Sequence, residues 1–307
     1  MTTGSGLPAN LLVFERGWLS SNNILFRGDI SCAVVDSGYS SHSAQTVALV
    51  QHTLGGRPLD VLLNTHLHSD HCGGNAALQA QYPSLQTLIP AGLAPHVANW
   101  DPVALTYEPT GQYCPPFRFD GLLQSGREVV LGGSAWQVHS APGHDPHSVI
   151  LFEPRERVLI SADALWENGF GVIFQELEGD KAFDEVGKTL DLIERLKPLT
   201  VIPGHGNVFS AVDGALATAR KRLDGFLRDP VKHARHAAKV LLKFKLLELQ
   251  QLPQVDLSAW AAATPYLHMV QKRFFAEADL REWVGELSDD LIRSGAARRE
   301  GGFILNA

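Results

Sequence analysis

The run THLHSDHCGG (residues 65–74) directly follows the apolar segment LDVLLN (residues 59–64). It places three histidines and one aspartate within six residues: His66, His68, Asp70 and His71. A strand or helix cannot direct all four side chains to one face, whereas a loop that leaves the end of a buried strand can aim them at one or two points. Imidazole nitrogen and carboxylate oxygen are preferred ligands of Zn²⁺ and also suit iron and manganese. The run therefore predicts a metal-binding loop at the end of a buried strand.

Three later segments have the same design, in which a metal-competent side chain follows an apolar run. His144 lies in SAPGHDPHS, Asp163 in SADAL and His205 in PGHG. Each lies in a turn that contains glycine or alanine, which lets the backbone approach closely. Any one of these residues alone is better explained as a structural polar residue. Four such sites in one chain favour a shared metal centre.

Together these segments resemble the metallo-β-lactamase superfamily of metallo-hydrolases, over about residues 10–210. The matching motifs, in the family's order, are HLHSDH (66–71), Gly143-His144, Ala162-Asp163 and Gly204-His205. Asp36, in AVVDSG, matches an early strand-end aspartate that in the family supports the metal loop without binding metal. The resemblance implies an α/β protein with an αββα sandwich, in which two mixed sheets pack face to face with helices outside. It also implies a metal site at one edge of the sheets.

The resemblance further implies two divalent metal ions, with zinc expected and iron or manganese as alternatives. Its ligand groups are His66, His68 and His144 for one ion, and Asp70, His71 and His205 for the other. Asp163 would bridge both ions. A hydroxide shared by the ions is the implied nucleophile, because a bound metal lowers the pKa of water to about 7. Asp70 is the implied catalytic residue that takes or returns a proton, and Asp36 the acceptor for a ligand imidazole.

Apolar runs that alternate with helical patterns predict the elements of this layered fold. Strands are expected within residues 9–37 and at 59–64, 85–89, 128–139, 149–160 and 199–202, and helices at 43–54, 75–81 and 183–196.

The composition changes after residues 228–230, which predicts a catalytic domain over 1–228 and a second module over 229–307. Residues 1–230 carry 15 basic and 24 acidic side chains, whereas 231–307 carry 11 and 9. Apolar residues recur at helical spacing over 231–249, a second helix is expected near 280–292, and the glycines of SGAARREGGFILN are typical of a hairpin. This module resembles the winged-helix-like extension of some superfamily members.

Two interpretations of this module stay open because the helix expected at 231–249 is basic. Its cations are Lys232, Arg235, Lys239, Lys243 and Lys245. They could contact nucleic acid phosphates. The favoured interpretation is that the interspersed leucines pack on the catalytic domain or on a partner subunit. The second case would make the protein a homodimer.

Composition also restricts partners and compartment. A net charge of −7 gives no general field that attracts nucleic acid or an anionic membrane. Three cysteines imply no disulfide framework, and neither a signal peptide nor a membrane-spanning run is recognisable. These features favour a cytoplasmic protein with a small-molecule substrate.

Four further residues are expected near the substrate: His147, Trp166, Phe170 and Phe174. His147 follows His144 by three residues, where a structural role is the favoured alternative, and the three aromatic residues follow Asp163. Aromatic side chains beside a metal centre favour an organic substrate with an apolar portion, and ordinary core packing explains each of them equally well. The irregular segment 100–116 is long enough to act as a lid.

The expected function is therefore a dinuclear metallo-hydrolase of an ester, thioester or lactone. An RNA- or DNA-processing phosphodiesterase steered by the basic helix is one alternative, and a mononuclear iron oxygenase acting on a thiol-derived substrate is another. Asp163 disfavours a true β-lactamase, because those enzymes generally lack the bridging carboxylate. Only 41 residues separate Asp163 from His205, so the long insert of the β-CASP nucleases is absent.

Overall fold

In the computed structural model, which describes residues 6–179 and 181–307, the chain divides into two units by its internal contacts. The first unit comprises the chain up to Leu105 together with Tyr113–Asp224. The second comprises Thr106–Gln112 and Gly225–Ala307. The middle of the segment expected to act as a lid therefore belongs to the second unit, where Pro109 accepts a hydrogen bond from the Tyr266 N–H (3.0 Å).

A mixed six-stranded sheet, in the order β1-β2-β3-β4-β5-β6, opens the first unit. Its strands are β1 Leu11–Phe14, β2 Asn23–Arg27, β3 Cys32–Val35, β4 Val61–Leu63, β5 Gln86–Pro90 and β6 Gly121–Leu123. β1, β2 and β3 pair antiparallel, whereas β3 to β6 run parallel. The carboxyl ends of β3 and β4 therefore meet at one edge of this sheet.

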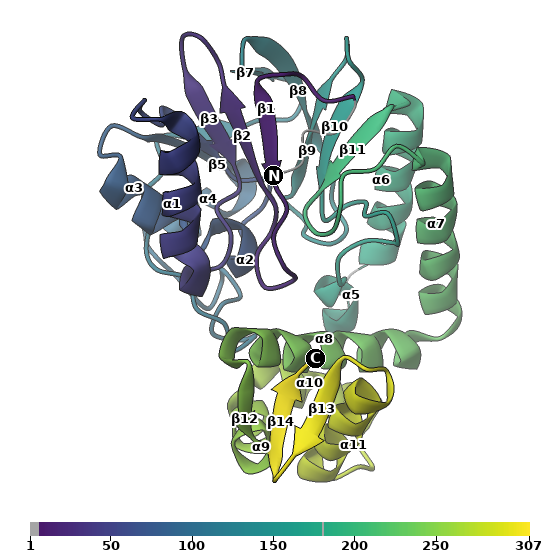
Figure 1. Cartoon of the computed structure of the whole chain (residues 1–307). Helices are drawn as coiled ribbons and strands as arrows, with labels where there is room; N and C mark the ends of the chain where they lie inside the picture. The colour runs from purple at the N-terminus through teal and green to yellow at the C-terminus, as the bar shows by residue number, and fades with distance from the viewer. Residues whose placement is uncertain (1–5, 180) are drawn as a thin grey trace. The chain divides into compact units, whose positions relative to one another are not determined.

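A five-stranded sheet, in the order β11-β10-β9-β8-β7, lies against the first (Figure 1). Its strands are β7 Glu128–Leu131, β8 Ser134–Ser140, β9 Val149–Glu153, β10 Val158–Ala162 and β11 Thr200–Pro203. The runs expected as single strands at 128–139 and 149–160 are in fact hairpins. Gly132, Gly133 and Arg157 adopt positive φ angles of 59°, 86° and 56°, and a left-handed backbone turns the chain back on itself.

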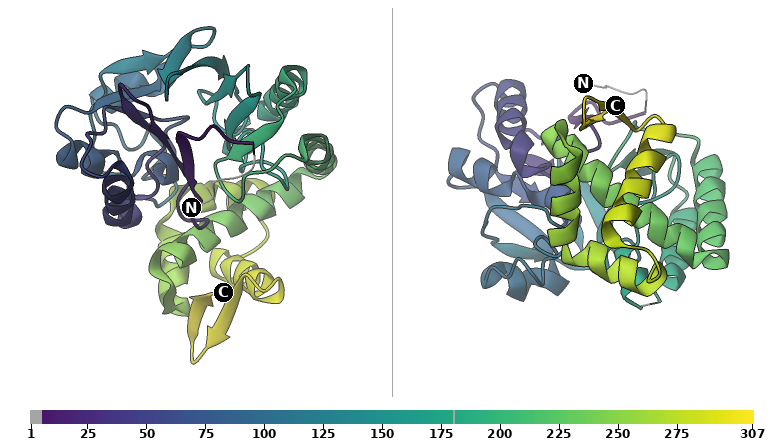
Figure 2. Two further views of the ribbon diagram at one scale, coloured as in Figure 1. Left: turned by 45° about the horizontal axis from the view of Figure 1, so that its top comes forward. Right: turned by 90° about the horizontal axis from the view of Figure 1, so that it is seen from below.

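The strands of the first sheet bury apolar side chains on both faces. In β2, Ile24 and Phe26 enter the core between the two sheets, whereas Leu25 enters a second core beneath the helices. This alternation follows from the period of two along a strand. The outer core packs against α1 (Ser43–Leu54) and α3 (Asn75–Gln81), and α6 (Ala182–Leu196) and α7 (Val212–Arg228) lie beyond the other sheet (Figures 1 and 2). The four layers confirm the expected α/β sandwich.

Shorter helices connect these layers. They are the 3₁₀ turns η1 (Ser40–His42) and η2 (Ala91–Leu93) and the helices α2 (Ser69–Cys72), α4 (Ala94–Ala98) and α5 (Phe174–Glu178). Sequence analysis overlooked α7, whose glycines at 214 and 225 each lower helix propensity by about 1 kcal/mol relative to alanine.

The second unit is a set of helices followed by a small antiparallel sheet. The helices are α8 Pro230–Leu249, α9 Gln254–Ala263, α10 Pro265–Phe274 and α11 Leu280–Arg293, and the sheet has the order β12-β14-β13, with β12 Gln251–Pro253, β13 Ala297–Glu300 and β14 Phe303–Asn306. The side chain of Asp279 accepts hydrogen bonds from two backbone N–H groups at the start of α11 and caps that helix. The expected helical C-terminal region and its hairpin are confirmed, whereas α9 and α10 were not foreseen.

Helix α8 packs within its own unit. Leu241, Leu242 and Leu246 are buried, and α8 lies against α10, α11, β12 and β14. Sequence analysis considered only the catalytic domain or a partner subunit as cover for this apolar face, and the structure supplies cover from the unit itself.

Four of the five cations of α8 are also engaged there. Arg235 Nε donates to Asp290 Oδ2 (2.7 Å), and Lys239 Nζ lies 3.8 Å from the same oxygen. Lys243 donates to the Ala296 carbonyl and Lys245 pairs with Glu248. These cations stabilise the fold of the second unit rather than forming an open basic surface.

The helices in the described ranges lack the combination of length and apolar character that crossing a bilayer requires. The longest, α8, has 20 residues but carries all five of these cations.

Replacing Leu242 by alanine is expected to lower the free energy of unfolding by about 2–5 kcal/mol, because a fully buried side chain is lost from a packed core. Leu249, at the end of the same helix, is 48% exposed, so Leu249→Ala is a matched control with an expected change of about 0.5 kcal/mol or less. Urea unfolding followed by circular dichroism measures both. Equal losses in the two variants would contradict the burial of α8 within its unit.

Candidate metal centre

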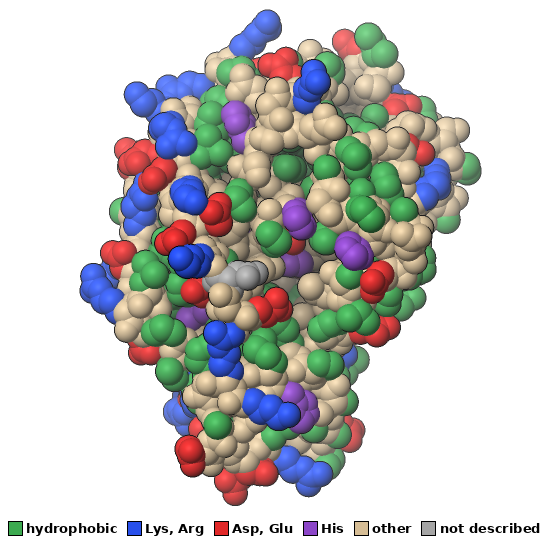
Figure 3. All heavy atoms as spheres, turned by 180° about the vertical axis from the view of Figure 1, so that it is seen from behind, with side chains coloured by type: hydrophobic (Ala, Val, Ile, Leu, Met, Phe, Trp, Pro, Cys, Tyr) green, Lys and Arg blue, Asp and Glu red, His purple; other side chains and the backbone are tan. Residues whose placement is uncertain are grey.

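The metal-competent residues singled out in the sequence lie in loops at the ends of strands. His66 and His68 follow β4, and Asp70 and His71 lie in the short helix α2. The remaining ligands follow strands of the other sheet: His144 after β8, Asp163 after β10 and His205 after β11. Figure 3 shows a face of the molecule on which several histidine side chains gather, with an acidic side chain between two of them.

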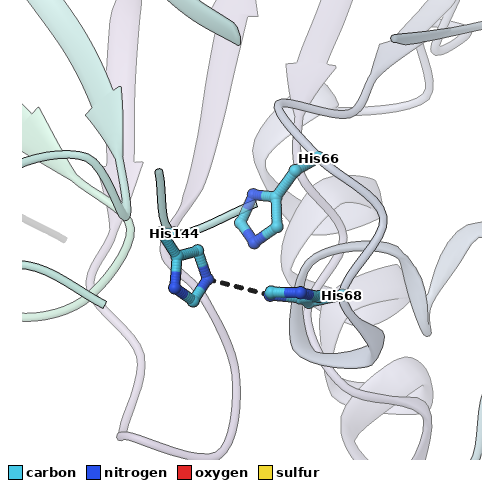
Figure 4. A group of neighbouring side chains, drawn as sticks. All are labelled: His66, His68 and His144. Atoms are coloured by element: carbon cyan, nitrogen blue, oxygen red, sulfur yellow. Dashed lines mark hydrogen bonds between the residues drawn. The ribbon is translucent and has the colours of Figure 1, made fainter. Parts of the chain in front are cut away.

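His66, His68 and His144 form one compact group, and their ligand atoms lie within 4.8 Å of one another. The three rings converge from two loops (Figure 4), with His68 Nδ1 and His144 Nε2 only 2.8 Å apart. The other ring nitrogen of His144 donates to the Val172 carbonyl (2.6 Å), which turns Nε2 toward the group. His66 Nε2 is buried and has no hydrogen-bond partner among the described residues. A cation bound by the three nitrogens would satisfy that orphaned atom, so this donor set fits a metal ion.

Asp70, His71, Asp163 and His205 form a second group of four residues, whose ligand atoms also lie within 4.8 Å of one another. His205 Nε2 lies 3.1 Å from Asp70 Oδ2, and His71 Nε2 lies 3.4 Å from Asp163 Oδ1. His71 Nε2 is buried and makes no hydrogen bond of normal geometry. Two carboxylates and two imidazoles suit a divalent cation, so this group also fits a metal ion.

The Asp163 carboxylate lies between the two groups. Its Oδ2 is 3.4 Å from His144 Nε2 in the first group, and its Oδ1 is 3.4 Å from His71 Nε2 in the second. The indole Nε1 of Trp166 donates to Oδ1 (3.1 Å) and fixes the orientation of the carboxylate. Because each oxygen faces a different group, this carboxylate has the geometry of a shared ligand.

Asp36 fixes the loop that carries the histidines. Its Oδ2 accepts hydrogen bonds from His71 Nδ1 and the Thr65 hydroxyl, both at 2.8 Å, and its Oδ1 accepts from the Thr65 N–H (2.8 Å). The bond to Nδ1 directs the other nitrogen of His71 at the second group. Asp36 itself has a φ of 58°, a strained backbone conformation that persists because these bonds hold it in place.

The electrostatics of the two groups differ. In the first group, burial lowers the pKa of His66 well below its usual value and that of His144 to about 4, which leaves neutral ligands at neutral pH. In the second, burial alone would raise the pKa of Asp163, but His71 and His205 hold it well below its usual range. Burial likewise disfavours a charged His71, yet the carboxylates of Asp163 and Asp36 raise its pKa well above normal. The excess negative charge at the second group favours a cation there.

The loop between β1 and β2, which was not predicted from the sequence as part of the site, connects two of the segments that carry candidate ligands. The Ser21 N–H donates to the Asp70 carbonyl (2.9 Å), and the Asn22 N–H donates to the Gly204 carbonyl (2.7 Å). The Asn22 side chain also donates to the Pro203 carbonyl (3.0 Å). These residues are fully buried although all four of SSNN (20–23) are polar. Four consecutive polar residues between apolar strands were the available signal.

The aromatic residues expected near the substrate take different positions. Trp166 is at the centre, with its ring 5.5 Å from that of His205. Phe170 is buried beneath the Arg222 guanidinium, and Phe174 begins α5 half-buried. The exposed ring of His147 lies over Gly92.

Residues 16–205 match the model of the metallo-beta-lactamase superfamily. The chain belongs to this superfamily. Relatives include an acyl-coenzyme A thioesterase, MBLAC2, of Gallus gallus, which is 28% identical over 68% of this chain and 80% of the relative. A hydroxyacylglutathione hydrolase of Francisella tularensis is 30% identical over 52% of this chain, which spans about half (54%) of that relative.

Solved structures share the fold. A metallo-beta-lactamase family protein from Thermus thermophilus is 19% identical with a TM-score of 0.54, and the match covers 97% of this chain and 98% of that protein. TTHA1623 in a di-iron-bound form is 25% identical with a TM-score of 0.52, over 68% of this chain and 98% of that protein. The superfamily fold implies divalent metal ions, and the two groups supply residues that could hold them.

Gly204→Ala is expected to displace Asp163 and weaken metal retention by about 10–100-fold, because a Cβ at position 204 would lie 2.1 Å from Asp163 Oδ1. Gly214 in α7 has open space around it, so Gly214→Ala is the matched control and should retain metal like the unmodified protein. Metal content after dialysis against a graded chelator measures the difference. Equal retention in both variants would show that Gly204 does not constrain the centre.

Proposed function

We propose that the chain is a dinuclear metal-dependent hydrolase of a small thioester or a related ester or lactone. The observation that carries this proposal is the Asp163 carboxylate, whose two oxygens face two separate groups of metal-competent side chains. The named activities of its relatives, an acyl-coenzyme A thioesterase and a hydroxyacylglutathione hydrolase, support a thioester as the leading substrate class.

The proposed ligand roles follow the two groups. His66, His68 and His144 would hold one ion, and Asp70, His71 and His205 the other, with Asp163 shared. The donors are nitrogen and oxygen only, a set that zinc, iron and manganese all accept. Zinc is proposed as the native metal, and the di-iron form of TTHA1623 makes iron the principal alternative. When bound, two such ions supply an activated water and polarise a substrate carbonyl.

Asp70 is proposed as the residue that handles a proton. Its side chain is 15% exposed, compared with 6% for Asp163, so it is the more accessible of the two carboxylates. Its Oδ2 accepts from His205 Nε2, while the described part of the chain gives Oδ1 no hydrogen-bond partner. Oδ1 is therefore placed to take a proton from water and return it to the departing thiolate. Hydrolysis then gives one carboxylic acid and one thiol.

The other two candidate functions have less support. A phosphodiesterase would need free cations, and four of the five in α8 are engaged within the second unit. A mononuclear iron oxygenase would need one metal group, and two are present. We propose a small-molecule substrate and a cytoplasmic location, the latter on the composition argument.

The substrate class is tested with a panel of thioesters, esters, lactones, β-lactams and phosphodiesters, each assayed with Zn²⁺, Mn²⁺ and Fe²⁺. Thioester hydrolysis with two ions per chain is the expected result. One iron per chain with O₂-dependent turnover would reject the proposal in favour of an oxygenase. Exclusive cleavage of phosphodiesters would reject it in favour of a nuclease.

Asp163→Asn is expected to weaken metal retention and turnover together, because a neutral amide neither balances the charge between two cations nor bridges them well. Asp29 lies in the turn between β2 and β3, at the opposite end of β2 from the centre, so Asp29→Asn is the matched control. Elemental analysis and kcat are measured on the same preparations. An Asp163→Asn protein with two ions and full turnover would remove Asp163 from the centre.

A further inference from the structure

Two tryptophan side chains adjoin the second ligand group. The Trp18 ring stacks on His205, with centroids 5.5 Å apart and an interplanar angle of 7°. Trp166 meets Trp18 edge-on, at 5.3 Å and 67°. The three rings form a continuous aromatic wall, defined here as Trp18, Trp166 and His205.

Hydrogen bonds hold the segments that carry the wall. Trp166 is fixed by the hydrogen bond from its Nε1 to Asp163 Oδ1 (3.1 Å). Trp18 lies in the loop between β1 and β2, where the Arg16 N–H donates to Asn22 Oδ1 (2.9 Å) and the Ser20 N–H donates to the Gly17 carbonyl (3.1 Å). These bonds order the loop that carries Trp18, and the ring contacts with His205 and Trp166 orient its indole.

Trp18 keeps an exposed surface. His205 stacks on its indole and Trp166 meets it edge-on, yet the residue is still 55% exposed. Large aromatic side chains prefer to be covered, and planar rings stack on one another at centroid distances of about 4.5–7 Å. An exposed, flat indole beside the candidate ligand groups suits a planar apolar group of the substrate.

Two arginines of the described residues flank the loops of this wall. Arg16 turns its guanidinium to Asn23, Thr46 and Gln45, where it makes three hydrogen bonds. Arg222 lies over the Phe170 ring, with its centroid 5.7 Å away. These arginines, which flank the loops of the wall, are both engaged, which favours recognition of an apolar acyl group over recognition of an anionic thiol carrier.

We infer that Trp18 and Trp166 select substrates whose acyl group carries a planar aromatic ring, which stacks on the exposed part of the Trp18 indole. This inference rests on the proposed thioester hydrolysis and adds the class of acyl group to it. Trp18 acts as a specificity-determining residue, whereas the ligand groups serve every substrate.

The kinetic test compares two thioesters of N-acetylcysteamine, with phenylacetyl or cyclohexylacetyl as the acyl group. Both have the same carbon number and the same uncharged thiol, and only one ring is planar. The unmodified, metal-loaded protein is expected to prefer the phenylacetyl substrate by about tenfold in kcat/KM. Trp18→Leu should reduce this preference to about twofold or less, and Trp18→Phe should restore part of it. Ile30→Ala, an exposed apolar position in the turn between β2 and β3, should keep the full preference.

A binding test uses the same protein without turnover. Phenylacetate and cyclohexylacetate carry the same carboxylate, so their affinities by calorimetry differ only through the ring. Phenylacetate is expected to bind about tenfold tighter, and Trp18→Leu to remove the difference, with metal content measured in every variant.

The outcomes separate this inference from the proposed function. Hydrolysis of both thioesters at equal rates by the unmodified protein, or an undiminished preference in Trp18→Leu with both ions retained, would overturn the inference alone. Aromatic-selective binding that depends on Trp18, without hydrolysis of either thioester, would support the wall and reject the thioesterase proposal.

Discussion

Ionisable side chains are packed together at one edge of the sheets in the first unit, away from the water that would otherwise solvate them. Moving a charge into such surroundings costs several kcal/mol unless a partner compensates it. Hydrogen bonds from His71 and Thr65 stabilise the buried Asp36 carboxylate. The hydrogen bond from Trp166 and the neighbouring imidazoles stabilise that of Asp163. The negative charge left over at Asp70 and Asp163 is the physical reason why a cation belongs in this place.

The backbone around these side chains also has to leave room for them and to hold them close together. A Cβ at position 204 would overlap Asp163 Oδ1, and a Cβ at position 171 would overlap the ring of His144. Both positions therefore require glycine. Asp36 and Ala162 hold left-handed backbone conformations, with φ of 58° and 46°, where β3 and β10 deliver the chain to the centre. Strain of about 1–3 kcal/mol at each such residue persists only because neighbouring contacts determine its position.

The α/β layering and the candidate ligand residues could be predicted because their signals are local, whereas the αββα sandwich and the division into two groups came from the resemblance to the superfamily. HLHSDH follows an apolar strand, and His144, Asp163 and His205 each follow one too. The partners of Trp18 and Asn22 were not predicted, because each depends on the loop between β1 and β2 meeting segments far along the chain, and the polar run SSNN gives no sign of which segments those are. Leucine spacing predicted the helix α8 itself, but a period of 3.6 states which face is apolar and not what covers it.

The spread of the ligands along the chain sets when the centre is completed during synthesis. Translation delivers the N-terminal segments first, so the β1–β2 hairpin and the histidine loop exist before β11 has been made. The last parts of the candidate centre to be synthesised are His205 and the Gly204 carbonyl, which accepts a hydrogen bond from the Asn22 N–H. Until β11 is made, the proposed ligand set of the histidine loop lacks His205. Under that ligand set, a complete centre would require the two sheets to be joined, so bound ions would stabilise their contact rather than the first sheet alone.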